Sequence, residues 1–463
     1  MTLIIVCLMI VAFLLIATES LTKTNRAAVA IFAGTLGWVL YICYGTDFVM
    51  SQHPADFSNF LDGKQSTSVT VKEYIASNIF LKYVGTASEI VLFLLATMTI
   101  VEILNNNGCF DFLKQMLRTR KSKRMLWTLA GITFVLSANL DNLTSTTMML
   151  TMMHGVVPNR RQRMVYGAVI VLAANWGGLL TVIGEPSQLL IWNRGAVTAT
   201  NYSLSLLLPC MAGWLLPTWW LGRSLPEHVD TEWITMPYRG DDTNLNVWQR
   251  LVMLLVGIGG LWFIPTFHNI TKLSPFLGAL CVLGLLWIVN EAFNRKLMSV
   301  DKMVQDRVPR VLRYGTSQMM LFVMGIMLLL GVVKETGALS SFALWWDMHV
   351  QNVWLSGAAA AALSSVLDNF VTAAGCFTLY PILTDAAAPF SELFTQNGLF
   401  WKVISFSVVA GGNVLAAGSL SGMALMKLEH VHTGWYFRNV GVKALAGGAL
   451  GLAILWITET FLK

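Results

Sequence analysis

The chain has 463 residues, of which 55% are hydrophobic and only 12% are charged, and its mean hydropathy is +0.62. Soluble domains carry about 25% charged residues, so this composition excludes an ordinary soluble protein and predicts a polytopic membrane protein in contact with the lipid bilayer. The formal net charge of +6 lies mostly in a few loops. It therefore reports membrane topology and does not indicate nucleic-acid binding.

Ten apolar segments of roughly 17–25 residues, some of them longer, have the length that crosses a bilayer. They lie near residues 2–18, 27–45, 85–104, 165–195, 204–222, 248–264, 273–291, 314–334, 398–428 and 442–461. The first segment lacks a basic start and a small-residue cleavage site, so we interpret it as a span and not as a cleaved signal peptide.

Two further apolar stretches, 125–157 and 350–383, are too long for one spanning helix and are interrupted by the polar sequence LDN. Each arm has about a dozen residues, which is typical of a re-entrant segment. Basic residues flank the first stretch on both sides, whereas 335–401 contains no Lys or Arg, so we expect cytoplasmic flanks for the first hairpin and outside flanks for the second. The flanking basic residues are Lys114, Arg118, Arg120, Lys121, Lys123, Arg124, Arg160, Arg161 and Arg163. A further basic loop, 292–313, is expected in the cytoplasm.

Three sequence blocks recur in the same order in the two halves of the chain. "LFLLATMTIVEILNNNG" resembles "LFVMGIMLLLGVVKETG", LSxxLDN occurs at 136–142 and 363–369, and GGx5G occurs at 177–184 and 411–418, with offsets of 229, 227 and 234 residues. Five spans and one hairpin per half make an odd number of crossings, so the two repeats are expected to be inverted. The predicted organisation is repeat 1 at 1–224 (hairpin 125–157, broken helix 165–195), a cytoplasmic linker at 225–247, and repeat 2 at 248–463 (hairpin 350–383, broken helix 398–428).

Inverted repeats place broken helices at the bilayer midplane, where substrates and ions bind. The two LDN tips and the two GGx5G segments predict four such breaks. Glycine tolerates unusual dihedral angles, so we expect backbone breaks at Gly177, Gly178, Gly184, Gly411, Gly412 and Gly418. Hydroxyl, carboxamide, carboxylate and carbonyl oxygens are the ligands that a hard cation prefers. The candidates near the breaks are Ser137, Asp141, Asn142, Thr144, Ser145, Asn175, Thr181 and Glu185, and then Ser364, Asp368, Asn369, Thr372, Asn413, Ser419 and Ser421.

Asp141 is the carboxylate that we expect to exchange a proton for a cation. Burial in the membrane favours the protonated form and a bound cation favours the ionised form, so the two compete for one site. The second half is less acidic, because Ser419 stands where Glu185 stands in the first half. There are structural alternatives: Asp141 and Asp368 could be helix N-caps, and Glu185, which precedes Pro186, could simply mark a helix restart.

The motifs "SANLDNLTST", "AANWGGLLTVIGEPSQLLIW", "SSVLDNFVTAA" and "AGGNVLAAGSLSGMALMKLE" resemble those of NhaD-type sodium/proton antiporters of the ion transporter superfamily, from about residue 85 onward. The resemblance implies efflux of Na⁺ or Li⁺ coupled to proton entry, a homodimer, and functional roles for Asp141, Asn142, Thr144, Asn175, Asp368 and Asn369. Two positions differ from the family pattern: Phe370–Thr372 replace an expected Pro-Leu pair, and Glu185 replaces an expected Asp.

The leading hypothesis is therefore an antiporter that exchanges Na⁺ or Li⁺ for H⁺ by alternating access in a bacterial cytoplasmic (inner) membrane. The alternative is a cation-coupled carrier of an anion such as a dicarboxylate or an arsenite-like oxyanion. Acidic tips without Lys or Arg near the predicted midplane favour a cation as substrate, although helix N-termini alone can hold carboxylates. A channel is a weaker alternative, because paired inverted breaks are typical of carriers. HExxH, GxSxG and a Gly-rich phosphate loop are absent, which argues against an enzyme, and the six scattered cysteines predict no cofactor or resident metal.

Overall fold

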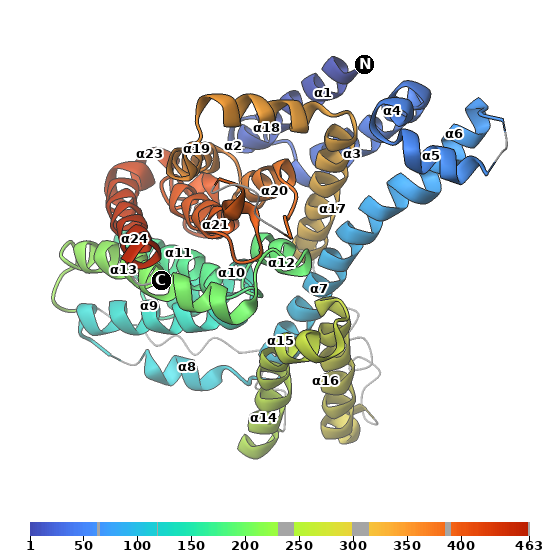
Figure 1. Cartoon of the computed structure of the whole chain (residues 1–463). Coiled ribbons are helices and arrows are strands. Elements are labelled where there is room, and N and C mark those ends of the chain that lie inside the picture. Colours follow the sequence, from blue (N-terminus) through green and yellow to red (C-terminus); the bar gives the residue numbers. More distant parts are fainter. Residues whose placement is uncertain (63–64, 118, 230–244, 299–313, 385–389, 462–463) are drawn as a thin grey trace. The chain divides into compact units, whose positions relative to one another are not determined.

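The computed structural model describes residues 1–62, 65–117, 119–229, 245–298, 314–384 and 390–461, and almost all of this part is helical (Figure 1). The predicted all-α class is therefore confirmed. Within these ranges, eight helices are long and apolar enough to cross a membrane. Arg118, most of the predicted linker 225–247 and most of the basic loop 292–313 lie outside the described residues.

Helices cover all the spans that were predicted in the first half. They are α1 (Thr2–Ala17), α2 (Glu19–Thr22), α3 (Arg26–Cys43), α4 (Gly45–Gln52), α5 (Pro54–Leu61), α6 (Ser68–Tyr74), a π-helical segment (Ile75–Phe80), α7 (Leu81–Asn106), α8 (Asp111–Met116), α9 (Ser122–Asn139), α10 (Asn142–His154), α11 (Arg160–Leu180), α12 (Pro186–Asn193) and α13 (Ala199–Gly222). The short helices α4, α5 and α8 were not predicted, because they are too short to give a membrane-length apolar signal.

The second half is also covered by helices at every predicted span. They are α14 (Val247–Leu254), a π-helical segment (Leu255–Gly259), α15 (Gly260–Thr271), α16 (Pro275–Met298), α17 (Tyr314–Glu335), α18 (Ala338–His349), α19 (Val353–Val366), α20 (Asn369–Leu379), a 3₁₀ turn (Ser391–Phe394), α21 (Leu399–Gly412), a 3₁₀ turn (Ala416–Gly418), α22 (Leu420–Glu429), α23 (Thr433–Tyr436), a π-helical segment (Phe437–Gly441) and α24 (Val442–Phe461).

All four predicted interruptions of the helices are present. The first LDN lies between α9 and α10, and the second between α19 and α20. The first GGx5G lies between α11 and α12, and the second between α21 and α22. The broken-helix pattern was thus correctly predicted, because a polar or glycine-rich sequence in an apolar run leaves a local signal.

The chain forms two compact units. The first comprises Met1–Leu92, Tyr314–Asn352 and Phe370–Pro381, and the second comprises Phe93–Arg313, Val353–Asn369 and Ile382–Lys463. Each unit takes segments from both predicted repeats. The predicted repeat boundaries follow a different criterion, similarity of sequence, and stay a prediction.

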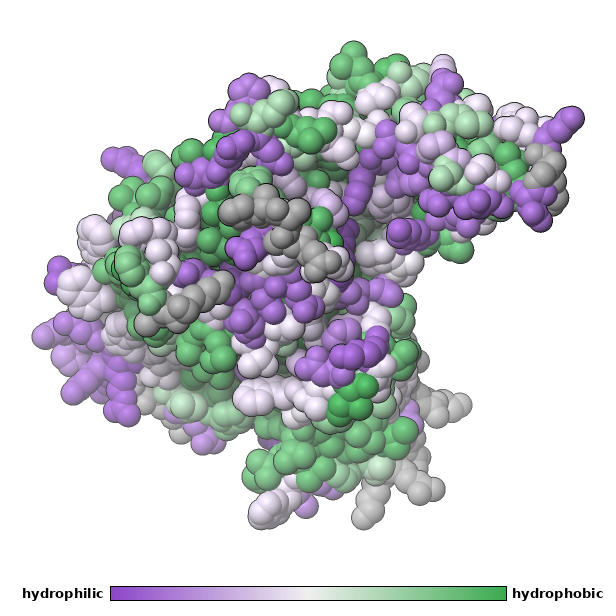
Figure 2. Space-filling model, viewed as in Figure 1, coloured by the Kyte–Doolittle hydropathy of each residue, from purple (hydrophilic) through white to green (hydrophobic). Residues whose placement is uncertain are grey.

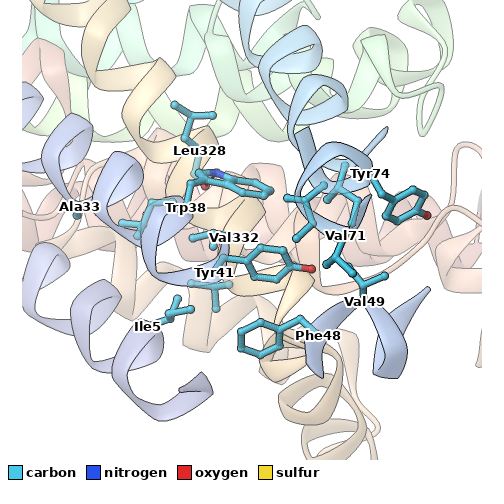
Figure 3. Packing of buried hydrophobic residues seen from close by; sticks show 14 of the residues in the cluster. Ile5, Ala33, Trp38, Tyr41, Phe48, Val49, Val71, Tyr74, Leu328 and Val332 are labelled. Carbon is cyan, nitrogen blue, oxygen red and sulfur yellow. The ribbon is translucent and has the colours of Figure 1, made fainter. Parts of the chain in front are cut away.

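In the first unit, α3 packs closely on α17. A side chain at Gly34 would meet the carbonyl oxygen of Gly325, so the two backbones approach closely at this point. Trp38 donates a hydrogen bond from its indole nitrogen to the Leu328 carbonyl at 3.0 Å. Around this contact, Tyr41 stacks on Phe48 in a cluster of buried hydrophobic side chains (Figure 3).

In the second unit, α11 is the central helix, and it is buried from Tyr166 to Leu179. It packs against α9, α10, α13 and α22. The segment from α14 to α16 instead exposes large apolar side chains, among them Trp248, Leu255 and Ile288, and hydrophobic residues cover this region in Figure 2. Such a surface is suited to contact with lipid.

A buried ion pair fastens α21 to α24 in the second unit. The Lys402 ammonium lies 2.7 Å from Oε1 of Glu459, and it also donates to the hydroxyl of Ser205 on α13 at 2.9 Å. Among the described residues, Lys402 is the only Lys or Arg that is buried. A charge in such a place requires its counter-ion, so this pair holds the first half of the broken helix α21–α22 in position.

We expect Lys402→Met to lower the free energy of unfolding by about 3–5 kcal/mol, because the Glu459 carboxylate is then buried without its cation. The double variant Lys402→Met/Glu459→Leu should recover most of this loss, since an apolar pair of similar volume replaces the ions. Unfolding of the purified protein in detergent measures both. A double variant that is as unstable as the single one would contradict this role for the ion pair.

Candidate functional site

Each hairpin tip packs against the glycine-rich break of its own half. In the first half, the Asn142 backbone N–H donates to the Gly184 carbonyl at 3.2 Å, and Gly178 lies against the Asn142 side chain. In the second half, Gly412 lies against the Asn369 side chain. The contact between a hairpin tip and a glycine-rich break therefore occurs twice in the second compact unit.

The glycines of the two GGx5G motifs make the same contacts at the same positions. A side chain at Gly177 would overlap with the Phe134 carbonyl on α9, and one at Gly411 would overlap with the Ala361 carbonyl on α19. Likewise, Gly184 lies against the Ser137 carbonyl, and Gly418 lies against the Ser364 carbonyl. The contacting pairs are related by the offsets of 234 and 227 residues that relate the motifs themselves.

The physical reason we gave for these glycines was wrong. None of Gly177, Gly178, Gly184, Gly411, Gly412 and Gly418 has a positive φ. The first pair of each motif lies in the last turn of its helix, α11 or α21, and the break follows it. The glycines are needed because a hairpin backbone approaches at these points, not because they unwind the helix.

We expect Gly411→Ala to destabilise the protein by about 1–3 kcal/mol or more, because the methyl group has no space beside Ala361. Gly177→Ala should destabilise the protein by a similar amount, since the added methyl group would overlap with the Phe134 carbonyl in the same way. Gly131→Ala on α9 is the matched control: nothing lies within 4 Å of the added atom, so it should be neutral or stabilising. The melting temperatures of the three variants in detergent measure these effects. Equal melting temperatures for all three variants would contradict the close contact at Gly411 and Gly177.

Polar side chains join the two halves across the breaks. Asn175 donates from its amide to the Asn413 oxygen at 2.8 Å and to the Ser419 hydroxyl at 3.0 Å. Ser421 donates to the Asn142 carbonyl at 3.2 Å. One network of buried hydrogen bonds thus contains residues from the first tip, from the first broken helix and from the second broken helix.

Through Glu185, the hydrogen-bond network extends to the second hairpin. The Asn369 amide donates to Oε1 of Glu185 at 3.2 Å, and the Ser364 hydroxyl donates to the oxygen of Asn369 at 2.9 Å. Asp368 and Asp141 are close enough to act electrostatically on the Glu185 carboxyl group. Three buried carboxyl groups, each at most 4% exposed, therefore share this region.

Asp141 is the N-cap of α10. Its Oδ1 accepts hydrogen bonds from the backbone N–H groups of Leu143 at 2.9 Å and Thr144 at 3.0 Å, and its Oδ2 accepts one from the Thr144 hydroxyl. Ser419 has the same position on α22 and accepts from the Gly422 N–H. The capping interpretation of Asp141 is therefore confirmed as one part of its role.

Glu185 precedes α12 and makes no capping bond. Its Oε2 is buried and accepts no hydrogen bond from the described residues, and the same holds for Oδ1 of Asn142 and for the hydroxyl of Ser145. Buried polar atoms are normally satisfied. These three oxygens are of the kind that coordinates a hard cation.

The other expected residues have different local partners. Ser137 donates to the Ala174 carbonyl at 2.6 Å, and Thr181 donates to the Ala138 carbonyl at 2.6 Å, so both hold the first hairpin against α11. Asn413 donates to the Val409 carbonyl. Thr372 lies on α20, which belongs to the first compact unit, and its role stays a prediction.

Gln188 was missed from sequence. It is 1% exposed on the first turn of α12, and its oxygen accepts from the Ser187 hydroxyl at 2.6 Å. The signal was the polar pair Ser187–Gln188 directly after Glu185 and Pro186, in an otherwise apolar span.

A multi-pass helical membrane protein whose interrupted helices surround buried carboxyl groups belongs to the class of membrane transporters. Comparison with known proteins agrees. A family model described as "citrate transporter" matches residues 13–411. The chain therefore belongs to this transporter family, and it is similar to proteins named sodium/proton antiporters, NhaD among them.

Similar proteins include two from Arabidopsis thaliana. Sodium/proton antiporter 1 is 33% identical over 371 residues, which are 79% of this chain and 61% of that protein. Sodium/proton antiporter 2 is 32% identical over 379 residues, 81% of this chain and 86% of the relative. The Na⁺/H⁺ antiporter NhaD of Vibrio cholerae is 23% identical over 390 residues, 79% of this chain and 76% of the relative.

Proposed function

We propose that the protein is a secondary antiporter that exchanges Na⁺ or Li⁺ for H⁺ by alternating access. The observation that supports this most directly is the Glu185 carboxyl group, which is buried within electrostatic reach of the buried Asp141 and Asp368 carboxyl groups and has one oxygen without a hydrogen bond from the described residues. Lys402, the buried cation of this part of the chain, contacts Glu459 and Ser205 instead. A buried group of carboxylates favours binding of H⁺ or a metal cation.

In this proposal, the exchange is a competition for the same buried oxygens. A proton neutralises the carboxyl groups when no cation is bound, and a dehydrated Na⁺ replaces it with oxygens from Asp141, Glu185, Asn142 and Ser145 as ligands. Because a carboxyl group in the membrane interior is costly when it is ionised and bare, the empty and ionised state is disfavoured. The protein therefore changes between its two access states with either H⁺ or Na⁺ bound.

The repeat architecture belongs to the same proposal. The contacts of Gly177 and Gly411, which recur at the offsets of the sequence motifs, support a duplication of one tip-and-break unit. We further propose that the two repeats are inverted, that the hairpins are re-entrant, that the midplane lies at the four breaks, and that the protein is a homodimer of an inner membrane. The names of the relatives agree with sodium/proton exchange.

The test is a pH-gradient assay in everted membrane vesicles, with Na⁺, Li⁺ and K⁺ added in turn. We expect Na⁺ or Li⁺ to evoke proton movement that membranes without the protein lack. The alternative, a cation-coupled anion carrier, agrees with the description of the family as citrate transporters. Uptake of a labelled dicarboxylate without any cation-evoked proton movement would overturn the proposal in favour of that carrier.

A further inference from the structure

A buried carboxylate at the far end of α22 takes no part in the network described above. Glu429 is the last residue of α22, and its side chain is only 2% exposed. The Nε of Arg163 donates to both of its oxygens, at 3.1 and 2.9 Å. Nδ1 of His154 lies 2.8 Å from Oε1. A carboxylate buried to this extent is retained only with such partners.

The basic partners also bind the backbone around Glu429. Arg160 donates to the carbonyls of Glu429 at 3.4 Å and His430 at 3.1 Å, at the C-terminal end of α22, where a positive charge is favoured. Arg163 donates in addition to the carbonyls of Val157 at 3.1 Å and Pro158 at 2.7 Å, in the connection between α10 and α11. The cluster of His154, Arg160, Arg163 and Glu429 therefore joins the ends of α10, α11 and α22.

The same three helices carry the candidate site at their opposite ends. α10 begins at Asn142 and ends at His154, and within α11 the same number of residues separates Arg163 from Asn175. α22 runs from its cap Ser419 to Glu429. At 1.5 Å per residue, the cluster lies about 15–18 Å from the site along each helix. Helices are stiff along their axes, so a shift at one end is transmitted to the other.

We propose that Glu429 is a positioning residue for the candidate cation site. By fixing α10, α11 and α22 to one another at one end, it sets the register in which Ser419 meets Asn175 and Ser421 meets the Asn142 carbonyl at the other. Without its charge, the residue at 429 no longer forms an ion pair with Arg163, and only one of its two acceptor oxygens remains for Arg163 and His154. The joint between the three helices is then weaker, and α22 can shift along α10 and α11. The ligand oxygens then lose their arrangement although none of them is altered.

The inference rests on the proposed exchange of a metal cation for protons. Its test compares Glu429→Gln and Glu429→Asp with wild type in reconstituted vesicles, and measures the half-saturating Na⁺ concentration, the maximum rate and the melting temperature. We expect Glu429→Gln to raise the half-saturating Na⁺ concentration about tenfold, as loss of a supporting contact does at metal sites. Glu429→Asp should recover most of this affinity, because it restores the charge.

The matched control is Glu392→Gln, the same chemical change at an exposed position of the 3₁₀ turn Ser391–Phe394. It should leave the half-saturating concentration unchanged. If Glu429→Gln does not fold, His154→Ala removes one partner and leaves the Arg163 ion pair, and should give a smaller shift in the same direction.

The outcomes separate the two proposals. A wild-type protein without cation-evoked proton movement would overturn the proposed function and this inference with it. A functional wild type whose Glu429→Gln and His154→Ala variants keep the wild-type half-saturating Na⁺ concentration, with only the melting temperature or the maximum rate lowered, would overturn the positioning role alone.

Discussion

Replacing Asp141 with asparagine is expected to abolish cation-evoked proton movement while the protein stays folded. Asparagine is as good an N-cap as aspartate, so its oxygen can still accept from the N–H groups of Leu143 and Thr144. The Thr144 hydroxyl, which now donates to Asp141, can accept from the new amide instead. The substitution therefore removes the charge and keeps the cap, and so separates the two interpretations of this residue.

The measurement is the pH-gradient assay together with a melting temperature in detergent. Asp62→Asn is the matched control, because Asp62 is exposed and asparagine tolerates its left-handed conformation (φ 43°). If Asp141→Asn keeps the wild-type exchange rate, Asp141 is only a helix cap, and the carboxylate that binds the ions must be another one.

Glu185→Gln should reduce the exchange rate by more than about 100-fold, to the level of vesicles without protein, because a ligand of the cation is lost and not merely a supporting contact. The glutamine oxygen can still accept from Asn369, and its amide can donate to the buried Asn142 oxygen that has no partner among the described residues. We therefore expect the variant to fold, and the loss to report the missing charge.

Glu185→Asp provides the comparison, since it keeps the charge on a side chain that is one methylene shorter. We expect it to exchange cations with an altered half-saturating concentration. Glu392→Gln again serves as the control. Full activity of Glu185→Gln would exclude Glu185 as a ligand and would leave Asp141 and Asp368 as the remaining carboxylates of the region.

The helices and their breaks were predictable because each has a local signal. Apolar length marks α3, α13 and α17, and a polar LDN or a glycine pair in an apolar run marks the interruptions at Asp141 and Gly411. The short helices α4, α5, α8 and α18 were missed, because none of them has membrane length.

The duplicated motifs single out most of the residues that contact one another around Asn175 and Glu185, and their functional roles stay a prediction. The hydrogen bonds between the two halves could not be predicted from the sequence. Nothing in the local sequence indicates that Asn175 donates to Asn413 or that Asn369 donates to Glu185. The Arg163–Glu429 and Lys402–Glu459 pairs were missed for the same reason. Each joins residues that are far apart in the chain, and only the packed structure brings them within reach.

Uptake of radioactive sodium into proteoliposomes with an acidic interior tests the central claim most directly, because the outward proton gradient is then the only source of energy. We predict that wild-type protein accumulates sodium above the outside concentration, that collapsing the gradient with a protonophore releases it, and that Asp141→Asn and Glu185→Gln abolish accumulation. Sodium that only equilibrates, with or without the gradient, would contradict coupled exchange at these carboxylates.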